Sequence, residues 1–325
     1  MTNRKPRVFA TRLFPEAVET RLTANFDAIL NPQDINYAAD ALAKASAGCD
    51  AIMCAAGDPL NAAAIEGLPA SIRMIATFSV GYEHIDVAAA TRRGIAVSNT
   101  PDVLTDATAD IAMLCLLGAA RRAHEGTTML RTHNWVGWSP RQLMGVHVTG
   151  KRLGILGMGR IGQAMADRAR AFRMQIHYSN RSRLPADLEK GAIFHAEPEA
   201  MLPQCDFLSI NAPMTPATRK WVNAERIEKL PKGAVVVNTA RGGVIDDEAL
   251  IAALKSGRLA AAGLDVFDGE PKINQGYYTL ENAFLLPHMG SATVETRNAM
   301  GFRALDNLEA FLLRGETPPD LVKAS

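Results

Sequence analysis

The stretch 151–172 constrains the fold of this chain more than any other part of the sequence. An apolar run at 153–156 meets the hexapeptide GMGRIG, and a helical apolar pattern follows at once. This order predicts a strand, a tight turn and a helix; the first glycine allows the bend, the second lets a pyrophosphate approach, and the third lets the helix pack on the strand. The N-terminus of the new helix would attract the phosphates. The stretch therefore predicts a dinucleotide site built on Gly157, Gly159, Arg160, Ile161 and Gly162.

Chain length and composition limit the remaining possibilities. A chain of 325 residues exceeds one ordinary core, so two domains are expected. The net charge of +1 gives no electrostatic reason to expect nucleic acid or a membrane surface as a partner. The four cysteines lack the CxxC spacing of a metal site, which predicts reduced thiols, no metal ion and a cytoplasmic protein. Residues 1–14 lack the apolar core of a signal peptide, and the longest apolar run, 111–120, is too short to span a bilayer.

The first hundred residues alternate between strand-like and helix-like patterns. The expected strands are 7–11, 28–30, 51–54, 74–78 and 95–98, and the expected helices are 16–25, 37–45, 62–65 and 87–92. This βαβ series predicts a parallel sheet. It contains no phosphate fingerprint, which favours a substrate-side domain. Asn99-Thr100-Pro101 then precedes a long helical pattern at about 104–122, where we place the domain crossover.

The alternation resumes after the glycine-rich turn and predicts a second parallel α/β sheet. Its later strands are expected at 175–179, 207–211, 234–239, 261–266 and 284–286. Ligands of such sheets bind at the carboxyl ends of the strands. The last helix, about 294–313, follows a break at Gly290-Ser291 and could close either domain.

Three polar residues stand out in the strand-end loops: Arg241, Glu270 and His288. Singly, each has an ordinary interpretation, as a solvated arginine, a turn residue before proline and a structural histidine. Together they suit carbonyl reduction by a nicotinamide. The imidazole can supply the proton, the carboxylate can fix its tautomer and favour the imidazolium, and the guanidinium can hold a keto acid through paired N–H donors.

These segments carry a family resemblance. The motifs GMGRIG, NTARGGVIDDEAL, GLDVFDGEP and LLPHMGSAT, with SVGYEHIDV and NTPDVLTDATADIAM before them, resemble the D-isomer-specific 2-hydroxyacid dehydrogenases over about 75–303. Within the family, VLTDATAD and the segment with Trp135 and Trp138 are most similar to the glyoxylate/hydroxypyruvate reductases. The resemblance implies an α/β fold of two doubly wound parallel-sheet domains. A Rossmann domain would span 101–289, and a flavodoxin-like substrate domain would combine 1–100 with 290–325.

The resemblance also implies roles for individual residues. Arg241, Glu270 and His288 would be catalytic, and the substrate would contact Val80, Gly81, Arg241, Ser291 and Trp138. Besides the glycine-rich turn, the cofactor contacts expected from the strand ends and from the resemblance together are Thr108, Asn180, Arg181, Ser182, Ala212, Pro213, Thr218, Thr239, Ala240, Asp265, His288 and Gly290. A homodimer built on the 104–122 helix is implied, with Trp138 reaching the neighbouring subunit's pocket; the alternative is that this helix is buried within one subunit.

The activity predicted from this set is reduction of glyoxylate or hydroxypyruvate. Formate dehydrogenases carry Gln where Glu270 stands, and long phosphoglycerate dehydrogenases append a regulatory domain, so neither is favoured. Enzymes of the 2-ketogluconate or D-lactate type share the catalytic residues and stay open as alternatives. A corepressor-like NAD(H)-binding protein is a non-enzymatic alternative, and a methyltransferase would leave the three polar residues without a role.

The residues after the 175–179 strand favour NADP(H), although NAD(H) is possible. A NAD-preferring site usually places a carboxylate about 20 residues beyond the fingerprint, on the ribose hydroxyls. This sequence has Asn180-Arg181-Ser182-Arg183 there. Arg181 and Ser182 could bind a 2′-phosphate, with Arg183 as a possible third contact. The alternative is that both arginines are solvated loop residues.

Overall fold

The molecule divides into two compact units. The structure is a computed structural model and describes residues 4–324. Unit 1 consists of the chain up to Leu104 and the chain from Ala292 onward, and unit 2 consists of Thr105–Ser291. Each unit is built on one parallel sheet, of five and seven strands respectively, which confirms the α/β class with two parallel sheets. The last helix belongs to unit 1.

Unit 1 has the strand order β2-β1-β3-β4-β5, which is the flavodoxin-like order. Its strands are β1 (Arg7–Ala10), β2 (Asp27–Ile29), β3 (Ala51–Cys54), β4 (Met74–Thr77) and β5 (Ala96–Ser98). Its helices are α1 (Glu16–Asn25), α2 (Ala39–Ala45), α3 (Ala62–Glu66), α4 (Val87–Arg92) and α12 (Val294–Leu312).

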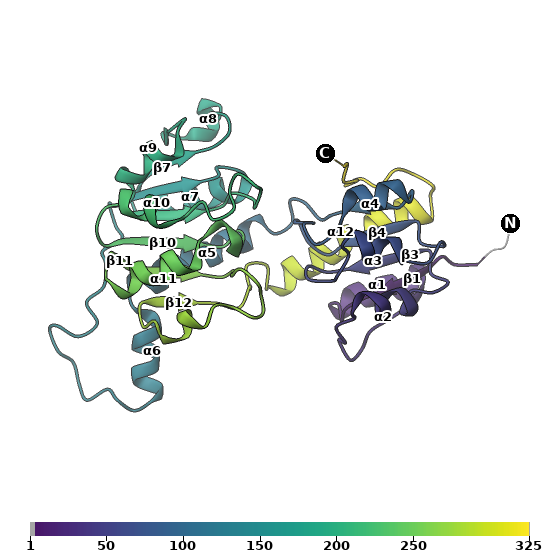
Figure 1. The fold of residues 1–325 in the computed structure, drawn as a ribbon, viewed down its shortest axis with the longest axis horizontal. Helices are drawn as coiled ribbons and strands as arrows, with labels where there is room; N and C mark the ends of the chain where they lie inside the picture. Colours follow the sequence, from purple (N-terminus) through teal and green to yellow (C-terminus); the bar gives the residue numbers. More distant parts are fainter. Residues whose placement is uncertain (1–3, 325) are drawn as a thin grey trace. The chain divides into compact units, whose positions relative to one another are not determined.

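Helices cover both faces of this sheet. Successive strand residues point to opposite faces, so Val8 joins the core under α1 and α12 while Phe9 joins the core under α2, α3 and α4. A strand buried on both faces is apolar throughout, which explains its uninterrupted sequence signal. A Cβ atom at Gly301 of α12 would overlap Val18 of α1, so this glycine lets the two helices pack closely (Figure 1).

Unit 2 has the strand order β12-β11-β10-β9-β6-β7-β8. This is the Rossmann order extended by one strand. All strands are parallel, but the order in which they follow one another reverses between β6 and β9, and ligands of such sheets bind at this switch point. The strands are β6 (Arg152–Leu156), β7 (Gln175–Ser179), β8 (Ile193–Phe194), β9 (Phe207–Ile210), β10 (Ala234–Asn238), β11 (Leu259–Leu264) and β12 (Ala283–Leu285).

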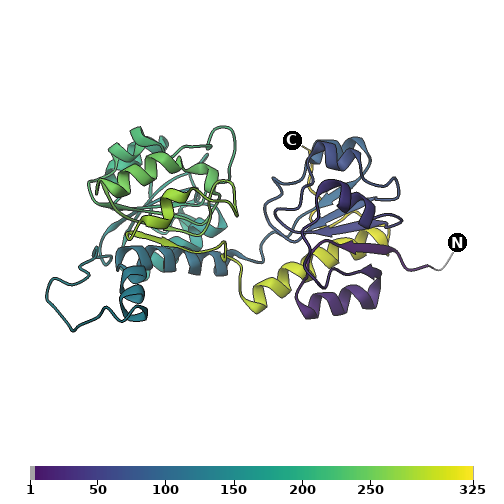
Figure 2. The same cartoon turned by 60° about the horizontal axis from the view of Figure 1, so that its bottom comes forward.

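The longest helix of unit 2, α5 (Thr105–Ala120), lies along its sheet (Figure 2). A Cβ atom at Gly263 of β11 would overlap the Cys115 carbonyl of α5, so helix and strand approach closely. Most of the apolar run 111–117 is buried in this packing, although Leu114 is exposed. The remaining helices are α6 (Ala123–Arg131), α7 (Arg160–Ala171), α8 (Ala186–Glu189), α9 (Pro198–Met201), α10 (Ala224–Lys229) and α11 (Asp247–Lys255), with short 3₁₀ turns η1 (Leu202–Gln204), η2 (Gly242–Val244) and η3 (Gln275–Thr279).

Several elements differ from the sequence-based expectation, and two of them have a clear physical reason. The long helix ends at Ala120, because Arg122 adopts a left-handed backbone conformation (φ 53°) and the chain starts again as α6. The two-residue strand β8 was not predicted, because so short an edge strand carries no alternating pattern.

Candidate active site

The glycine-rich turn joins β6 to α7 with a different requirement at each glycine. Gly157 has φ 92°, and a Cβ atom there would lie 2.7 Å from the Ala212 nitrogen. A Cβ atom at Gly162 would overlap the Gly157 carbonyl. These two glycines are therefore required by the packing of the turn against β9 and against its own helix.

Gly159 is different, because nothing in the described chain excludes a side chain there. Its φ is −74°, and a Cβ atom would meet no atom within 4 Å. Gly159 caps α7, whose first residues are Arg160 and Ile161. The open space thus lies at the N-terminus of a helix that follows the switch-point strand, where a pyrophosphate needs close access to the backbone. The turn fits a dinucleotide.

Polar atoms at the ends of β9 and β10 also suit a ligand. Asn211 Oδ1 and Thr239 Oγ1 are buried and have no hydrogen-bond partner within residues 4–324. Buried polar atoms normally find partners, and a bound cofactor would supply them. Ala212, Pro213 and Ala240 lie in the same two loops, whereas the Thr218 hydroxyl donates to the Pro213 carbonyl (2.7 Å) and stabilises its own turn.

The structure brings His288 and Glu270 together. Nδ1 of His288 lies 2.7 Å from Oε2 of Glu270, while Oε1 of Glu270 accepts the N–H of Phe267 (2.7 Å). Burial alone would raise the pKa of Glu270, but the hydrogen bonds from His288 and Phe267 and the charge of Arg241 together lower it. Glu270 is therefore a carboxylate whose hydrogen bond to Nδ1 fixes the orientation of the imidazole.

The backbone around His288 is held in an unusual conformation. His288 has φ 52°, in the left-handed region that non-glycine residues rarely adopt. Its N–H donates to the Asp265 carbonyl (2.8 Å), and the Asp265 carboxylate accepts from the N–H groups of Met289 (2.7 Å) and Gly290 (2.8 Å). Burial raises the pKa of Asp265, and these two N–H groups oppose the rise. Strain that is retained in this way is common at functional sites.

Arg241 follows β10 in the loop beside Glu270. A Cβ atom at Gly242 would overlap the backbone of Phe267 and Asp268, so the two loops touch. Nη1 of Arg241 donates to the Ala240 carbonyl (2.7 Å), and the Arg241 carbonyl accepts from Asn238 Nδ2 (2.9 Å). Unit 2 thus gathers a cation, a carboxylate and an imidazole at the carboxyl ends of its strands.

The other predicted site residues are distributed over both units. A Cβ atom at Gly290 would lie 3.5 Å from Thr108 of α5, and Ser291 follows directly, so these residues adjoin the His288 turn. Trp138 lies in the segment between α6 and β6 and is 81% exposed. Val80 and Gly81 belong to unit 1, after β4, where their carbonyls accept from Asn99 Nδ2 (2.7 Å) and Ser79 Oγ (2.6 Å).

The segment after β7 contains no acidic residue at 180–183, as the sequence indicated. Asn180 is half-buried, and Arg181 and Ser182 are exposed. The structure adds a contact that the sequence analysis missed: Arg183 forms an ion pair with the buried Glu189 (2.8 Å). No periodic or motif signal marks this pairing.

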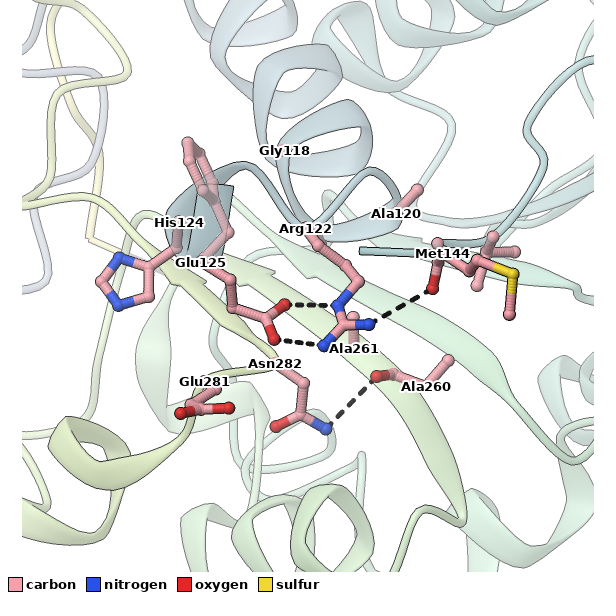
Figure 3. Close-up of a pocket in the computed structure, with 14 residues that line it drawn as sticks. Gly118, Ala120, Arg122, His124, Glu125, Met144, Ala260, Ala261, Glu281 and Asn282 are labelled. Atoms are coloured by element: carbon pink, nitrogen blue, oxygen red, sulfur yellow. Dashed lines mark hydrogen bonds and ion pairs between the residues drawn. The ribbon is translucent and has the colours of Figure 1, made fainter. Parts of the chain in front are cut away.

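A cavity of about 250 Å³ in unit 2 lies apart from all of these residues (Figure 3). It is lined by the end of α5, the start of α6, residues 144–146 and parts of β11 and β12, and includes no predicted site residue. Inside it, Arg122 Nε donates to Glu125 (2.7 Å). The cavity lies at the base of the segment that carries Trp138.

Comparison with known proteins decides the family. Residues 113–290 match the family described as D-isomer specific 2-hydroxyacid dehydrogenase, NAD binding domain. The chain belongs to this family. Since its two-sheet α/β fold agrees with that membership, the protein is an NAD(P)-dependent 2-hydroxyacid dehydrogenase.

Relatives of this dehydrogenase match over nearly the whole chain. It is 44% identical over 308 residues to glycerate dehydrogenase of Hyphomicrobium methylovorum, covering 94% of this chain and 96% of the relative. It is 43% identical to glyoxylate reductase of Thermococcus kodakarensis, covering 98% and 96%. The structure of an NADPH-dependent glyoxylate/hydroxypyruvate reductase from Sinorhizobium meliloti, in complex with NADP and malonate, matches with a TM-score of 0.86 at 33% identity and covers 99% of this dehydrogenase and 100% of that chain.

The described part of the dehydrogenase contains neither a membrane-spanning helix nor a metal-binding cluster. Within residues 4–324, no helix is both long and apolar enough to cross a bilayer. In the same part of the chain, no three His, Cys, Asp or Glu side chains are grouped so that they could hold a metal ion.

Proposed function

We propose that this enzyme reduces small 2-keto acids, glyoxylate to glycolate and hydroxypyruvate to D-glycerate, and prefers NADPH to NADH. The observation that carries the proposal is the His288–Glu270 pair, which lies with Arg241 at the carboxyl ends of strands in the sheet that also carries the glycine-rich turn. The names of the relatives support the substrate class.

The proposed chemistry assigns one task to each side chain. A reduced nicotinamide held by the strand-end loops of unit 2 would supply the hydride that C2 of the keto acid accepts. His288 gives its proton from Nε2 to the oxygen that becomes the hydroxyl, and Glu270 stabilises the imidazolium through Nδ1 before that step. Asp265 holds the turn that carries the imidazole. Reduction therefore requires protonated His288 and fades as the pH rises.

Substrate orientation is assigned to Arg241. Its planar guanidinium can hold a carboxylate through two parallel N–H donors, a geometry that lysine lacks. The backbone N–H groups of Val80 and Gly81 in unit 1, and Ser291, are further proposed substrate contacts. In this assignment unit 1 is the substrate-binding domain and unit 2 the cofactor-binding domain.

The cofactor assignment follows from the fit of unit 2 to a dinucleotide. Gly157, Gly159, Arg160, Ile161 and Gly162 would hold the pyrophosphate. The strand-end loops with Ala212, Pro213, Thr218, Thr239, Ala240 and Asp265, together with Thr108, His288 and Gly290, would surround the nicotinamide half. Asn180, Arg181 and Ser182 would meet the adenosine ribose, and the absence of a carboxylate there favours a 2′-phosphate.

A homodimer is part of the proposal. None of the side chains of α6 is buried, and Trp135, Val136 and Trp138 in the following segment are exposed. Exposed apolar side chains gathered on one segment are typical of an interface, and a second copy of the chain would cover them. Trp138 would then reach the neighbouring subunit's pocket. Light scattering at assay concentration tests this, since a fully active monomer would exclude it.

The experiment that tests the activity is a substrate panel. We expect the largest steady-state kcat/KM with glyoxylate or hydroxypyruvate and NADPH, measured beside pyruvate and 2-ketogluconate and with each nicotinamide. A preference for pyruvate or 2-ketogluconate would assign the enzyme to the alternative dehydrogenase types. No turnover with any of the four acids would favour the corepressor-like binding role and overturn the proposal.

A further inference from the structure

Three side chains of unit 2 form a closed set of contacts around the segment that follows β7. The hydroxyl of Tyr178 donates to Oε1 of Glu189 (2.6 Å). Arg183 donates from Nε to Oε1 (2.8 Å) and from Nη2 to Oε2 (3.0 Å) of the same carboxylate. We name Tyr178, Arg183 and Glu189 the loop clasp.

The clasp is anchored in the core at Tyr178. This residue is on β7, is completely buried, and packs on Phe194 with ring centroids 5.2 Å apart. Its hydroxyl also accepts the N–H of Leu184 (2.9 Å). One buried oxygen therefore holds both the backbone after Arg183 and the carboxylate of Glu189, which fixes the exit of the 180–183 segment.

A second anchor joins the clasp to α7, the helix that begins at the glycine-rich turn. The Glu189 carbonyl accepts from Nη2 of Arg170 (2.7 Å), and the adjacent Lys190 pairs with Asp167 (2.8 Å). Asp167 and Arg170 both lie on α7. The clasp thus fixes the 180–183 segment relative to the helix whose N-terminus would hold the pyrophosphate.

The clasp also controls charge next to this segment. The hydrogen bonds from Arg183 and Tyr178 lower the pKa of Glu189, so it is a carboxylate. A carboxylate without a partner would repel a nearby phosphate, but Arg183 neutralises it with both donors. Within residues 4–324, Arg181 forms no hydrogen bond or ion pair, whereas the guanidinium of Arg183 is paired with the Glu189 carboxylate. Arg181 and Arg183 therefore differ, because only Arg183 is paired with a carboxylate of the protein.

We infer that the loop clasp is a positioning device for cofactor specificity: it holds Asn180, Arg181 and Ser182 in place for the 2′-phosphate of NADP, and Arg183 acts through Glu189 and is not a phosphate ligand. This inference rests on the proposed NADPH preference. It explains how a short exposed segment can present a defined phosphate site.

Calorimetric titration of the full-length protein with two nucleotides tests the inference without turnover. Adenosine 2′,5′-bisphosphate and 5′-AMP differ only in the 2′-phosphate. Tyr178→Phe removes the clasp hydroxyl without changing any charge, and Arg183→Gln removes the arginine. We expect each variant to weaken the bisphosphate about tenfold and to leave 5′-AMP within about twofold. Arg173→Gln is the matched control, because it removes an exposed positive charge just before β7, and it should bind both nucleotides as wild type does.

The titrations distinguish the loop clasp from direct phosphate binding by Arg183 and from a failure of the NADPH preference. A loss confined to Arg183→Gln would make Arg183 a direct ligand and overturn the clasp, as would unchanged binding in both variants. Equal wild-type affinity for the two nucleotides would refute the NADPH preference itself, and the clasp with it. If thermal unfolding shows that Tyr178→Phe does not fold, Glu189→Asp replaces it, because this change keeps the charge but shortens the side chain that must reach both partners. The same tenfold selective loss is expected.

Discussion

Two hydrogen-bonded histidines of unit 2 differ in partner and in surroundings. His288 pairs with the Glu270 carboxylate (2.7 Å), and its side chain is 49% exposed. His177 on β7 pairs with the His195 ring (3.0 Å), and the residue is only 5% exposed. Burial, the neighbouring His195 and Arg152 lower the pKa of His177, so it is neutral near pH 7.

The difference supports His288, and not His177, as the proposed acid. A ring hydrogen bond of normal length is present in both places, so the bond alone does not identify the acid. At the carboxyl ends of the strands the partner of His288 is an anion and its side chain is half exposed. In the interior the partner is another imidazole, and Nε2 of His177 is buried without a hydrogen-bond partner within residues 4–324. Substitutions in the two regions should therefore have opposite effects on rate and stability.

His288→Ala should have the largest effect on rate. Loss of a positioned acid is expected to lower kcat about 10²–10⁴-fold. Thermal unfolding should change little, because the side chain is half exposed. Steady-state NADPH oxidation with hydroxypyruvate measures the rate. A kcat within tenfold of wild type would show that His288 is not the acid, and the proposed difference in role between His288 and His177 would be wrong.

Arg241→Lys should have the next largest effect. Lysine keeps the charge but lacks the paired donors, and charge-assisted hydrogen bonds contribute about 1.5–3 kcal/mol each. We expect kcat/KM for glyoxylate to fall about 10–100-fold while the KM for NADPH stays near wild type. Activity like that of wild type would mean that Arg241 supplies only charge at this edge of the sheet.

Arg181→Ala should act on the cofactor alone. Removal of one charge-assisted contact to the 2′-phosphate is expected to raise the KM for NADPH at least tenfold and to change that for NADH little. Both values come from steady-state rates at saturating keto acid. Equal losses with the two cofactors, or a wild type that prefers NADH, would show that the segment after β7 does not select the phosphate.

His177→Gln should have the smallest effect on rate, with kcat within about twofold of wild type, and should act on stability instead. Because the folded pKa of His177 is lowered, the unfolded chain binds more protons below about pH 6.5, its ordinary value. Wild-type stability should therefore fall as the pH drops from about 6.5, by up to about 1.4 kcal/mol per pH unit for one such group. Arg152 and Asp206, which form an ion pair at 2.8 Å, are the charged neighbours of His177.

Urea unfolding midpoints at pH 7 and pH 5.5 measure this dependence. The substitution should flatten it, since the titrating group is gone. His195→Gln is the matched variant, because burial also lowers the pKa of His195. An unchanged pH dependence in both variants would show that the pair does not control stability.

The sequence predicted the features that leave a periodic or motif signal. Strand-like and helix-like patterns along the chain marked the elements, and β7, α1 and α4 begin and end at the residues expected from them. The strand-end residues Glu270 and His288 were foreseen as partners because parallel strands end at one edge of a sheet.

The sequence could not show contacts that depend on short or irregular elements. Arg183 and Glu189 are joined across a four-residue helix, and Tyr178 reaches the same carboxylate from β7. The histidine pair depends on the pairing of β7 with the two-residue strand β8. In each case the partner is fixed by tertiary packing and not by spacing along the chain.

If His288 and Glu270 act as one unit, a double-mutant cycle of the two residues will show it. Single-turnover reduction of glyoxylate is measured for wild type, His288→Ala, Glu270→Gln and the double variant, because groups that act as a unit are strongly non-additive. We expect the double variant to be within about threefold of His288→Ala, since Glu270 has no task once the imidazole is gone. Losses that multiply, so that the double variant is slower by the full product of the two single effects, would contradict the account.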